Sequence, residues 1–131
     1  MGSFSILKKE DYHRIIPHPI TGERLTDNLR FLISLTGDKV IFYDRYIKSV
    51  VQIFEDKDGD YLQHCAVNGN GRFIVTASRN NMISVWDTKM RGSLFSLQWD
   101  TNITALDFCR DDIFCLICQD GSVSMIKIEN I

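Results

Sequence analysis

Few side chains in this sequence have the types and spacing that a catalytic site requires. The histidines are His13, His18 and His64. His64 precedes Cys65, but adjacent residues of a strand point to opposite faces, so these two side chains are not placed to act as a catalytic pair. His13 and His18 flank a proline-containing stretch, and the spacing gives them no further partner. We therefore predict that the chain is not an enzyme.

Two other short sequence patterns match metal-binding motifs in residue type but not in the geometry that a metal site needs. Cys115-Leu116-Ile117-Cys118 is a C-x-x-C, but positions i and i+3 of a strand face opposite sides and cannot easily hold one ion. The segment 56–60 (DKDGD) lacks the later ligands of a calcium loop. We expect reduced thiols, no metal and no cofactor.

Composition describes an ordinary folded domain rather than a disordered or membrane-spanning chain. The 131 residues are 44% hydrophobic and 24% charged, with a net charge of -2. No apolar run reaches the roughly 18 residues of a membrane helix. No basic excess indicates non-specific binding of nucleic acid. Nothing marks the chain as secreted, which predicts a cytoplasmic or nuclear protein.

The strongest pattern is a repeat in which two apolar segments enclose a polar turn. It occurs at 33–44, 76–87 and 116–127. The first two units end on Tyr43-Asp44 and Trp86-Asp87, which lie 43 residues apart, and the third ends 40 residues later. Such a period, with four short strands in each unit, is typical of the blades of a β-propeller.

The middle unit contains all four expected strands. They are predicted at 61–67, 72–78, 82–86 and 93–99, joined by short polar turns. The Trp86-Asp87 ending, Ser78 before the turn, and the blade spacing resemble the WD-repeat family. Residues 61–99 and 103–128 each resemble a repeat, and 31–55 resemble the last three strands of an earlier one.

The resemblance implies a polar network that this sequence carries only in part. In the family, a Gly-His dipeptide precedes the inner strand, and its histidine bonds an aspartate in the second turn. No repeat here has Gly-His, and only Asp120 stands at the place of the turn aspartate, with Asn80 and Gly37 at the other two. We expect these blades to depend more on apolar packing. Ser78, Tyr43, Asp44, Trp86 and Asp87 are the predicted structural motif residues.

The predicted fold is therefore all-β, a partial β-propeller of two and a half to three four-stranded antiparallel blades. We assign an N-terminal arm to 1–30 and blades to 31–60, 61–102 and 103–131. The last unit ends after its third strand, and the segment 1–7 (MGSFSIL) could supply the fourth.

Propellers use about 4–8 blades, because a blade cannot bury both faces alone. Three arrangements stay open for this chain. It is a piece of a longer propeller, it completes a ring with blades of a partner, or it forms a homodimer.

We expect a protein–protein interaction scaffold, a WD-repeat subunit or fragment of a larger complex. Its predicted partner-binding residues lie before inner strands and in second turns: Asp60, Tyr61, Arg79, Asn80, Asn81, Asn102 and Asp120. The alternative is an RNA-contacting subunit of a ribonucleoprotein. Its basic face would contain Lys8, Lys9, Arg14, Arg24 and Arg30, with Tyr12 available to stack.

Overall fold

The chain folds into three four-stranded antiparallel sheets. The computed structural model describes residues 2–11, 23–26, 28–56 and 60–129, with the backbone alone for residues 5–11 and 23. The first sheet contains β2 (Glu23–Leu25), β3 (Phe31–Thr36), β4 (Lys39–Asp44) and β5 (Ser49–Glu55). The middle sheet contains β6 (Leu62–Val67), β7 (Phe73–Ser78), β8 (Met82–Asp87) and β9 (Gly92–Gln98). The last sheet contains β10 (Ile103–Arg110), β11 (Ile113–Cys118), β12 (Ser122–Glu129) and β1 (Ser3–Asp11).

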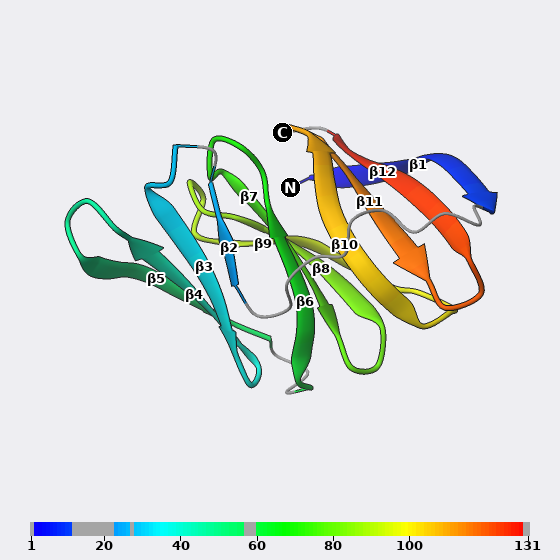
Figure 1. Ribbon diagram of the computed structural model, residues 1–131, viewed down its shortest axis with the longest axis horizontal. Coiled ribbons are helices and arrows are strands. Elements are labelled where there is room, and N and C mark those ends of the chain that lie inside the picture. Colours follow the sequence, from blue (N-terminus) through cyan, green and yellow to red (C-terminus); the bar gives the residue numbers. More distant parts are fainter. Residues whose placement is uncertain (1, 12–22, 27, 57–59, 130–131) are drawn as a thin grey trace.

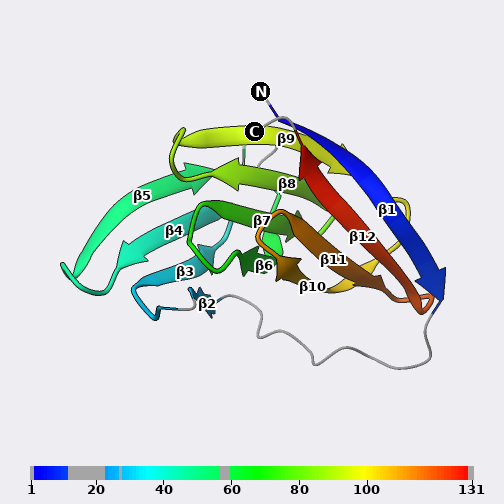
Figure 2. The same ribbon diagram turned by 90° about the horizontal axis from the view of Figure 1, so that it is seen from above.

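The sheets stand side by side, in the order first, middle and last (Figure 1). Seen from above, they form an arc (Figure 2). The outer strands β5, β9 and β1 follow its convex side, and the inner strands β2, β6 and β10 lie on the other side. This arrangement confirms the predicted partial β-propeller, with three complete sheets.

The N-terminal strand completes the sheet formed by the C-terminal end of the chain. β1 pairs antiparallel with β12, from Ser3 opposite Glu129 to Asp11 opposite Ser122. The ring of Phe4 also stacks on Phe95 of the middle sheet, with 5.2 Å between ring centroids. The prediction that the first residues supply the missing outer strand is confirmed. The range 1–30, predicted as an arm, thus contributes both β1 and β2 to the sheets.

Two apolar cores lie between the sheets, and the middle sheet contributes to both. One face of β7 and β8, with Val75, Ile83 and Val85, packs with Leu116 and Ile126 of the last sheet. The other face packs against the first sheet; there the buried residues are Ile33, Val40, Phe42, Phe54, Leu62, Cys65, Ile74 and Trp86. The alternation of strand side chains therefore gives the middle sheet two buried faces.

The first sheet leaves its second face uncovered. Cross-strand register places Leu25, Leu32 and Tyr43 in one row. This row continues to Val50, and the neighbouring row pairs Ile41 with Ile53. Leu25, Val50 and Ile53 are 45%, 48% and 55% exposed. Six residues form this uncovered face, which we call the open face: Leu25, Leu32, Ile41, Tyr43, Val50 and Ile53.

Candidate functional site

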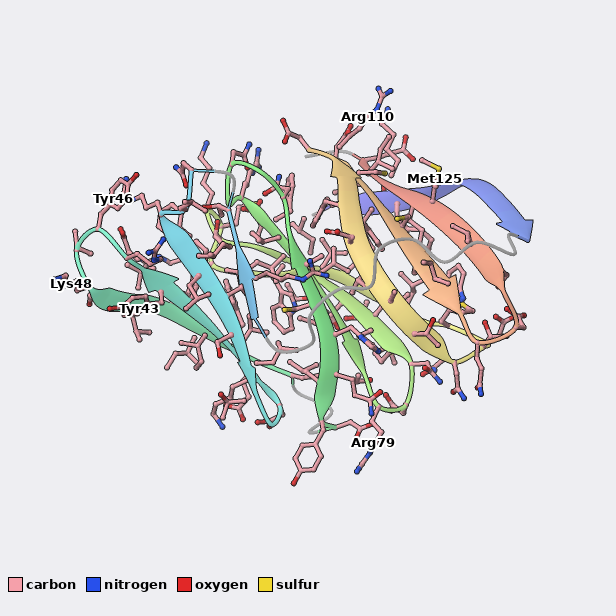
Figure 3. All side chains as sticks on the ribbon, in the orientation of Figure 1. Tyr43, Tyr46, Lys48, Arg79, Arg110 and Met125 are labelled. Carbon is pink, nitrogen blue, oxygen red and sulfur yellow. The ribbon has the colours of Figure 1, made fainter. Side chains whose placement is uncertain are left out.

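The predicted partner-binding residues lie at one end of the strands, on the middle and last sheets. This end, the Tyr61 edge, holds the turns β3–β4, β7–β8 and β11–β12 and the starts of β6 and β10. Asn81, Gly37 and Gly121 hold positive φ there, at 65°, 60° and 88°, and these residue types tolerate that conformation. Figure 3 shows Arg79 at this edge, opposite the end of the molecule that carries Arg110.

Three of the predicted residues, Asp60, Tyr61 and Arg79, form one cluster beside the start of β6. The Arg79 guanidinium lies 3.1 Å from Asp60 Oδ1 and 5.1 Å from the centroid of the Tyr61 ring. Asp60 Oδ2 also accepts a hydrogen bond of 3.0 Å from the backbone N–H of Asn80. Tyr61 is 58% exposed, so the cluster is an ordered but accessible aromatic–arginine pair. Tyrosine and arginine are enriched among the residues that contribute most to protein–protein binding.

A chain of amides extends this edge from the middle sheet to the last sheet. Asn81 Nδ2 donates to Asn102 Oδ1 at 3.0 Å, and Asn102 Nδ2 donates to Gln119 Oε1 at 2.9 Å. Asp120, beyond Gln119, accepts hydrogen bonds from the backbone N–H and the hydroxyl of Ser122. The structure thus brings all seven predicted positions to one edge.

The predicted motif residues serve the blades in different ways. Trp86 is buried, donates from Nε1 to Thr76 Oγ1 at 3.0 Å, and lies 5.3 Å from the ring of Phe54. Ser78 bonds Asn80 and accepts from the N–H of Met82, which ties the β7–β8 turn. Tyr43, the counterpart of Trp86, lies on the open face.

Asp44 and Asp87 form a repeated ion pair that the sequence analysis missed. Arg30 holds Asp44 with three hydrogen bonds of 2.9–3.2 Å, and Arg72 lies 3.2 Å from Asp87. The hydrogen bond from Arg30 is the main cause that lowers the pKa of Asp44 below its usual value. The signal was present in the sequence, because TDNLRF at 26–31 and NGNGRF at 68–73 lie 42 residues apart.

The inner strands carry a small polar cluster between the first and last sheets. Arg24 of β2 donates to the carbonyl of Leu106 at 3.2 Å and lies 3.8 Å from Asp107. Burial lowers the pKa of His64 on β6; a hydrogen bond to the backbone of Ile103 opposes this shift, and the charge of Arg24 adds to it.

Of the alternative basic face, the structure describes the side chains of Arg24 and Arg30, and these two do not share a surface. Arg24 lies on an inner strand, whereas Arg30 pairs with Asp44 at a strand end. The side chains of Lys8, Lys9, Tyr12 and Arg14 lie outside the described residues.

The cysteines show no metal-site geometry where the structure describes them. All four are free thiols, with Cys65 and Cys118 buried and Cys109 exposed. Burial is the main cause that raises the pKa of Cys115 to about 11. No group of three or more potential ligands among His, Cys, Asp and Glu comes together in the described part of the chain. Among the described residues there is also no helix that is long and apolar enough to cross a membrane.

Strand number, topology and edge-turn geometry place the chain in the class of β-propeller proteins. Residues 48–87 match the family model "WD domain, G-beta repeat", which confirms the predicted resemblance for β5 to β8. No curated protein matches the sequence. Among solved structures, the chain is similar to the β-propeller domain of Cps50 (Swd1) from Myceliophteria thermophila, with a TM-score of 0.65 and 14% identity. That match covers 88% of this chain and 35% of the other, so this chain spans about a third of that propeller domain.

Proposed function

We propose that the chain is a non-catalytic interaction scaffold, a subunit of an assembly in which blades of another protein cover the open face. The observation that carries the proposal is the apolar character of this face. In the middle sheet, the equivalent face carries Ile74 and Trp86 and is buried by the first sheet. In the first sheet, Leu32 and Tyr43 hold the same places, without a neighbouring sheet among the described residues.

The exposed apolar area of the open face favours its burial against a partner. Burial of apolar surface contributes roughly 25 cal/mol for each Å² removed from water. Val50 and Ile53 are about half exposed on β5, and Leu25 is similarly exposed on β2. A four-stranded blade is the shape that this twisted sheet already accepts on its other face. A second copy of this chain is the alternative occupant.

The Tyr61 edge is the second proposed contact surface of the scaffold. The cluster of Asp60, Tyr61 and Arg79 is held by its own hydrogen bonds and ion pair, so binding would cost little side-chain ordering. A protein partner is favoured over RNA because Arg24 and Arg30, the basic residues of the RNA hypothesis whose side chains are described, are each paired with an aspartate in a different part of the fold. Free thiols fit a cytoplasmic or nuclear location.

The test is affinity purification of the tagged chain from its native cells, with identification of the captured proteins. The variant Val50→Lys/Ile53→Lys places charge on the open face. The matched control Tyr46→Lys/Ile47→Lys replaces two apolar residues that are 66% and 60% exposed in the β4–β5 turn. We expect wild type and control to capture a second protein with propeller repeats, and the open-face variant to lose it.

Capture of the same proteins by all three forms would overturn the proposal for this face. Capture of a second, differently tagged copy of the chain alone would assign the face to a homodimer instead. The variant Tyr61→Ala/Arg79→Ala separates the two surfaces, because it should release only proteins that the open-face variant retains.

A further inference from the structure

A groove lies between the first and middle sheets at the end of the strands opposite the Tyr61 edge. We call this end, which holds the turns β4–β5, β6–β7 and β8–β9, the Tyr46 edge; Tyr46 and Lys48 are labelled there in Figure 3. The groove has a volume of about 430 Å³. Phe31, Phe42, Val51 and Gly71 supply its apolar lining.

The apolar lining is built by close packing between the two sheets. The rings of Phe31 and Phe42 stack with 4.8 Å between their centroids. Gly71, with φ of 80°, lets the β6–β7 turn approach, because an added Cβ would meet Phe31 Cδ2 at 3.2 Å and Thr26 Cγ2 at 3.3 Å. The shape of the groove is therefore set by packed groups.

The rim of the groove carries two cations, Lys89 and Arg91, that have no side-chain partner among the described residues. Arg72 also lines the groove but pairs with the buried Asp87 at 3.2 Å, and Asp44 lies beside it. Asp44 is 2% exposed and already accepts three hydrogen bonds from Arg30, so its charge is compensated. In the described part of the chain, neither Lys89 nor Arg91 has a side-chain hydrogen bond or ion pair.

The two neighbouring turns present cations in the same way. Lys48 and Arg91 are equivalent residues of the β4–β5 and β8–β9 turns, with φ of 56° and 59°. This left-handed conformation costs an L-residue roughly 1–2 kcal/mol and is usually occupied by glycine. Both turns also expose apolar side chains, since Tyr46, Ile47 and Met90 are 66%, 60% and 62% exposed.

These observations identify the chemistry of the ligand as both acidic and apolar. Unpaired cations attract carboxylates, and the exposed Val51 beside Phe31 offers contact to an aliphatic side chain. A nucleic acid is a poorer fit, because base stacking needs free ring faces. Phe42 is only 6% exposed, and Phe31 is engaged by Phe42 and by the Arg30 guanidinium at 5.0 Å.

We propose that this groove binds an acidic segment of a partner protein, with one apolar side chain against Val51 and Phe31 and carboxylates on Lys89 and Arg91. The site is separate from the open face and from the Tyr61 edge. It therefore extends the scaffold proposal without depending on either of those surfaces.

The probe is a fluorescein-labelled peptide in which one leucine is flanked on each side by three glutamates. Its binding to the 131-residue chain is measured by fluorescence anisotropy at low and high salt. The variants are Lys89→Gln/Arg91→Gln and Val51→Asp, which remove rim cations or add a carboxylate to the groove. The matched control Arg110→Gln/Lys127→Gln removes two cations of the last sheet and leaves the net charge equal to that of the rim variant.

We expect dissociation constants on the order of 10–100 µM at low salt, weakened about tenfold or more in both groove variants and less than about twofold in the control. Thermal melting verifies that each variant is folded. Equal weakening by the rim variant and the control would overturn the proposal, since it would show binding to diffuse charge. Absence of binding at low salt, or tighter binding of an oligouridine of equal charge, would overturn it as well.

Discussion

Arg30 and Arg72 each lie across the end of a strand pair and hold the aspartate that ends β4 or β8. The guanidinium of each also lies about 5 Å above the next phenylalanine ring, at 5.0 Å for Phe31 and 4.9 Å for Phe73. The backbone N–H of each arginine donates to an asparagine side chain two residues earlier. A repeated arginine–aspartate pair thus supplies polar order at the Tyr46 edge, whereas the histidine network of the resembled family involves the inner-strand start and the second turn, which lie at the Tyr61 edge.

Gly71 and Gly92 provide a matched test of the close packing at this edge. We predict that Gly71→Ala lowers the free energy of unfolding by about 1–2 kcal/mol, because of its positive φ and the contacts at 3.2 and 3.3 Å. A Cβ at Gly92 meets nothing within 4 Å. Gly92→Ala should therefore be neutral or slightly stabilising, as measured by urea denaturation. Equal losses in both variants would contradict this explanation.

His64 predicts a pH dependence of stability. Its folded-state pKa is lowered from 6.5, mainly by burial, so the unfolded chain binds the proton more readily. Stability from neutral His64 is present above pH 6.5 and declines as the pH falls below it. We predict that His64→Gln reduces the loss of unfolding free energy between pH 7 and 5. Urea denaturation at both pH values measures this loss, and an unchanged loss in the variant would show that other groups cause it.

At the scale of elements, the sequence repeat and the sheet are offset by one strand. The family match at 48–87 begins near β5 of the first sheet and ends with β8 of the middle sheet. Each outer strand therefore precedes, in the sequence, the three strands of the next sheet. β1 follows the same rule but pairs with β12, so that the two ends of the chain share one sheet.

Removal of β1 tests this closure. We predict that deletion of residues 1–11 lowers the melting temperature by about 5 °C or more and promotes aggregation, because the edge of β12 loses its partner. Deletion of residues 1–2 alone is the control and should have little effect. A synthetic peptide of residues 1–11 should restore part of the loss. An unchanged melting temperature, measured by scanning fluorimetry, would show that β1 contributes little.

The hairpins at 33–44, 76–87 and 116–127 could be predicted because alternation, turn residues and period agree in each of them. β2 was missed because three residues, Glu23–Leu25, are too few to show alternation. The Tyr61 edge was predictable, since turn positions follow from the strand order. The groove was not, because Phe31, Val51 and Gly71 come together only when two sheets pack.

At the scale of the whole molecule, the three sheets differ in how they are supported. The middle sheet packs on both faces, and every residue of β7 is buried. The first sheet packs on one face only, and its other face exposes Leu25, Val50 and Ile53. Local opening is governed by such differences in buried contacts, so the sheets should not open with equal ease.

Hydrogen exchange measured by mass spectrometry compares two matched hairpins. We predict that amides at 73–86, in the middle sheet, exchange more slowly than those at 31–43 in the first sheet, although both hairpins have the same strand pairing. A partner that covers the open face should slow exchange at 31–43 and leave 73–86 nearly unchanged. Equal protection of the two hairpins in the isolated chain would mean that one-sided packing already stabilises the first sheet, and that its open face needs no neighbour.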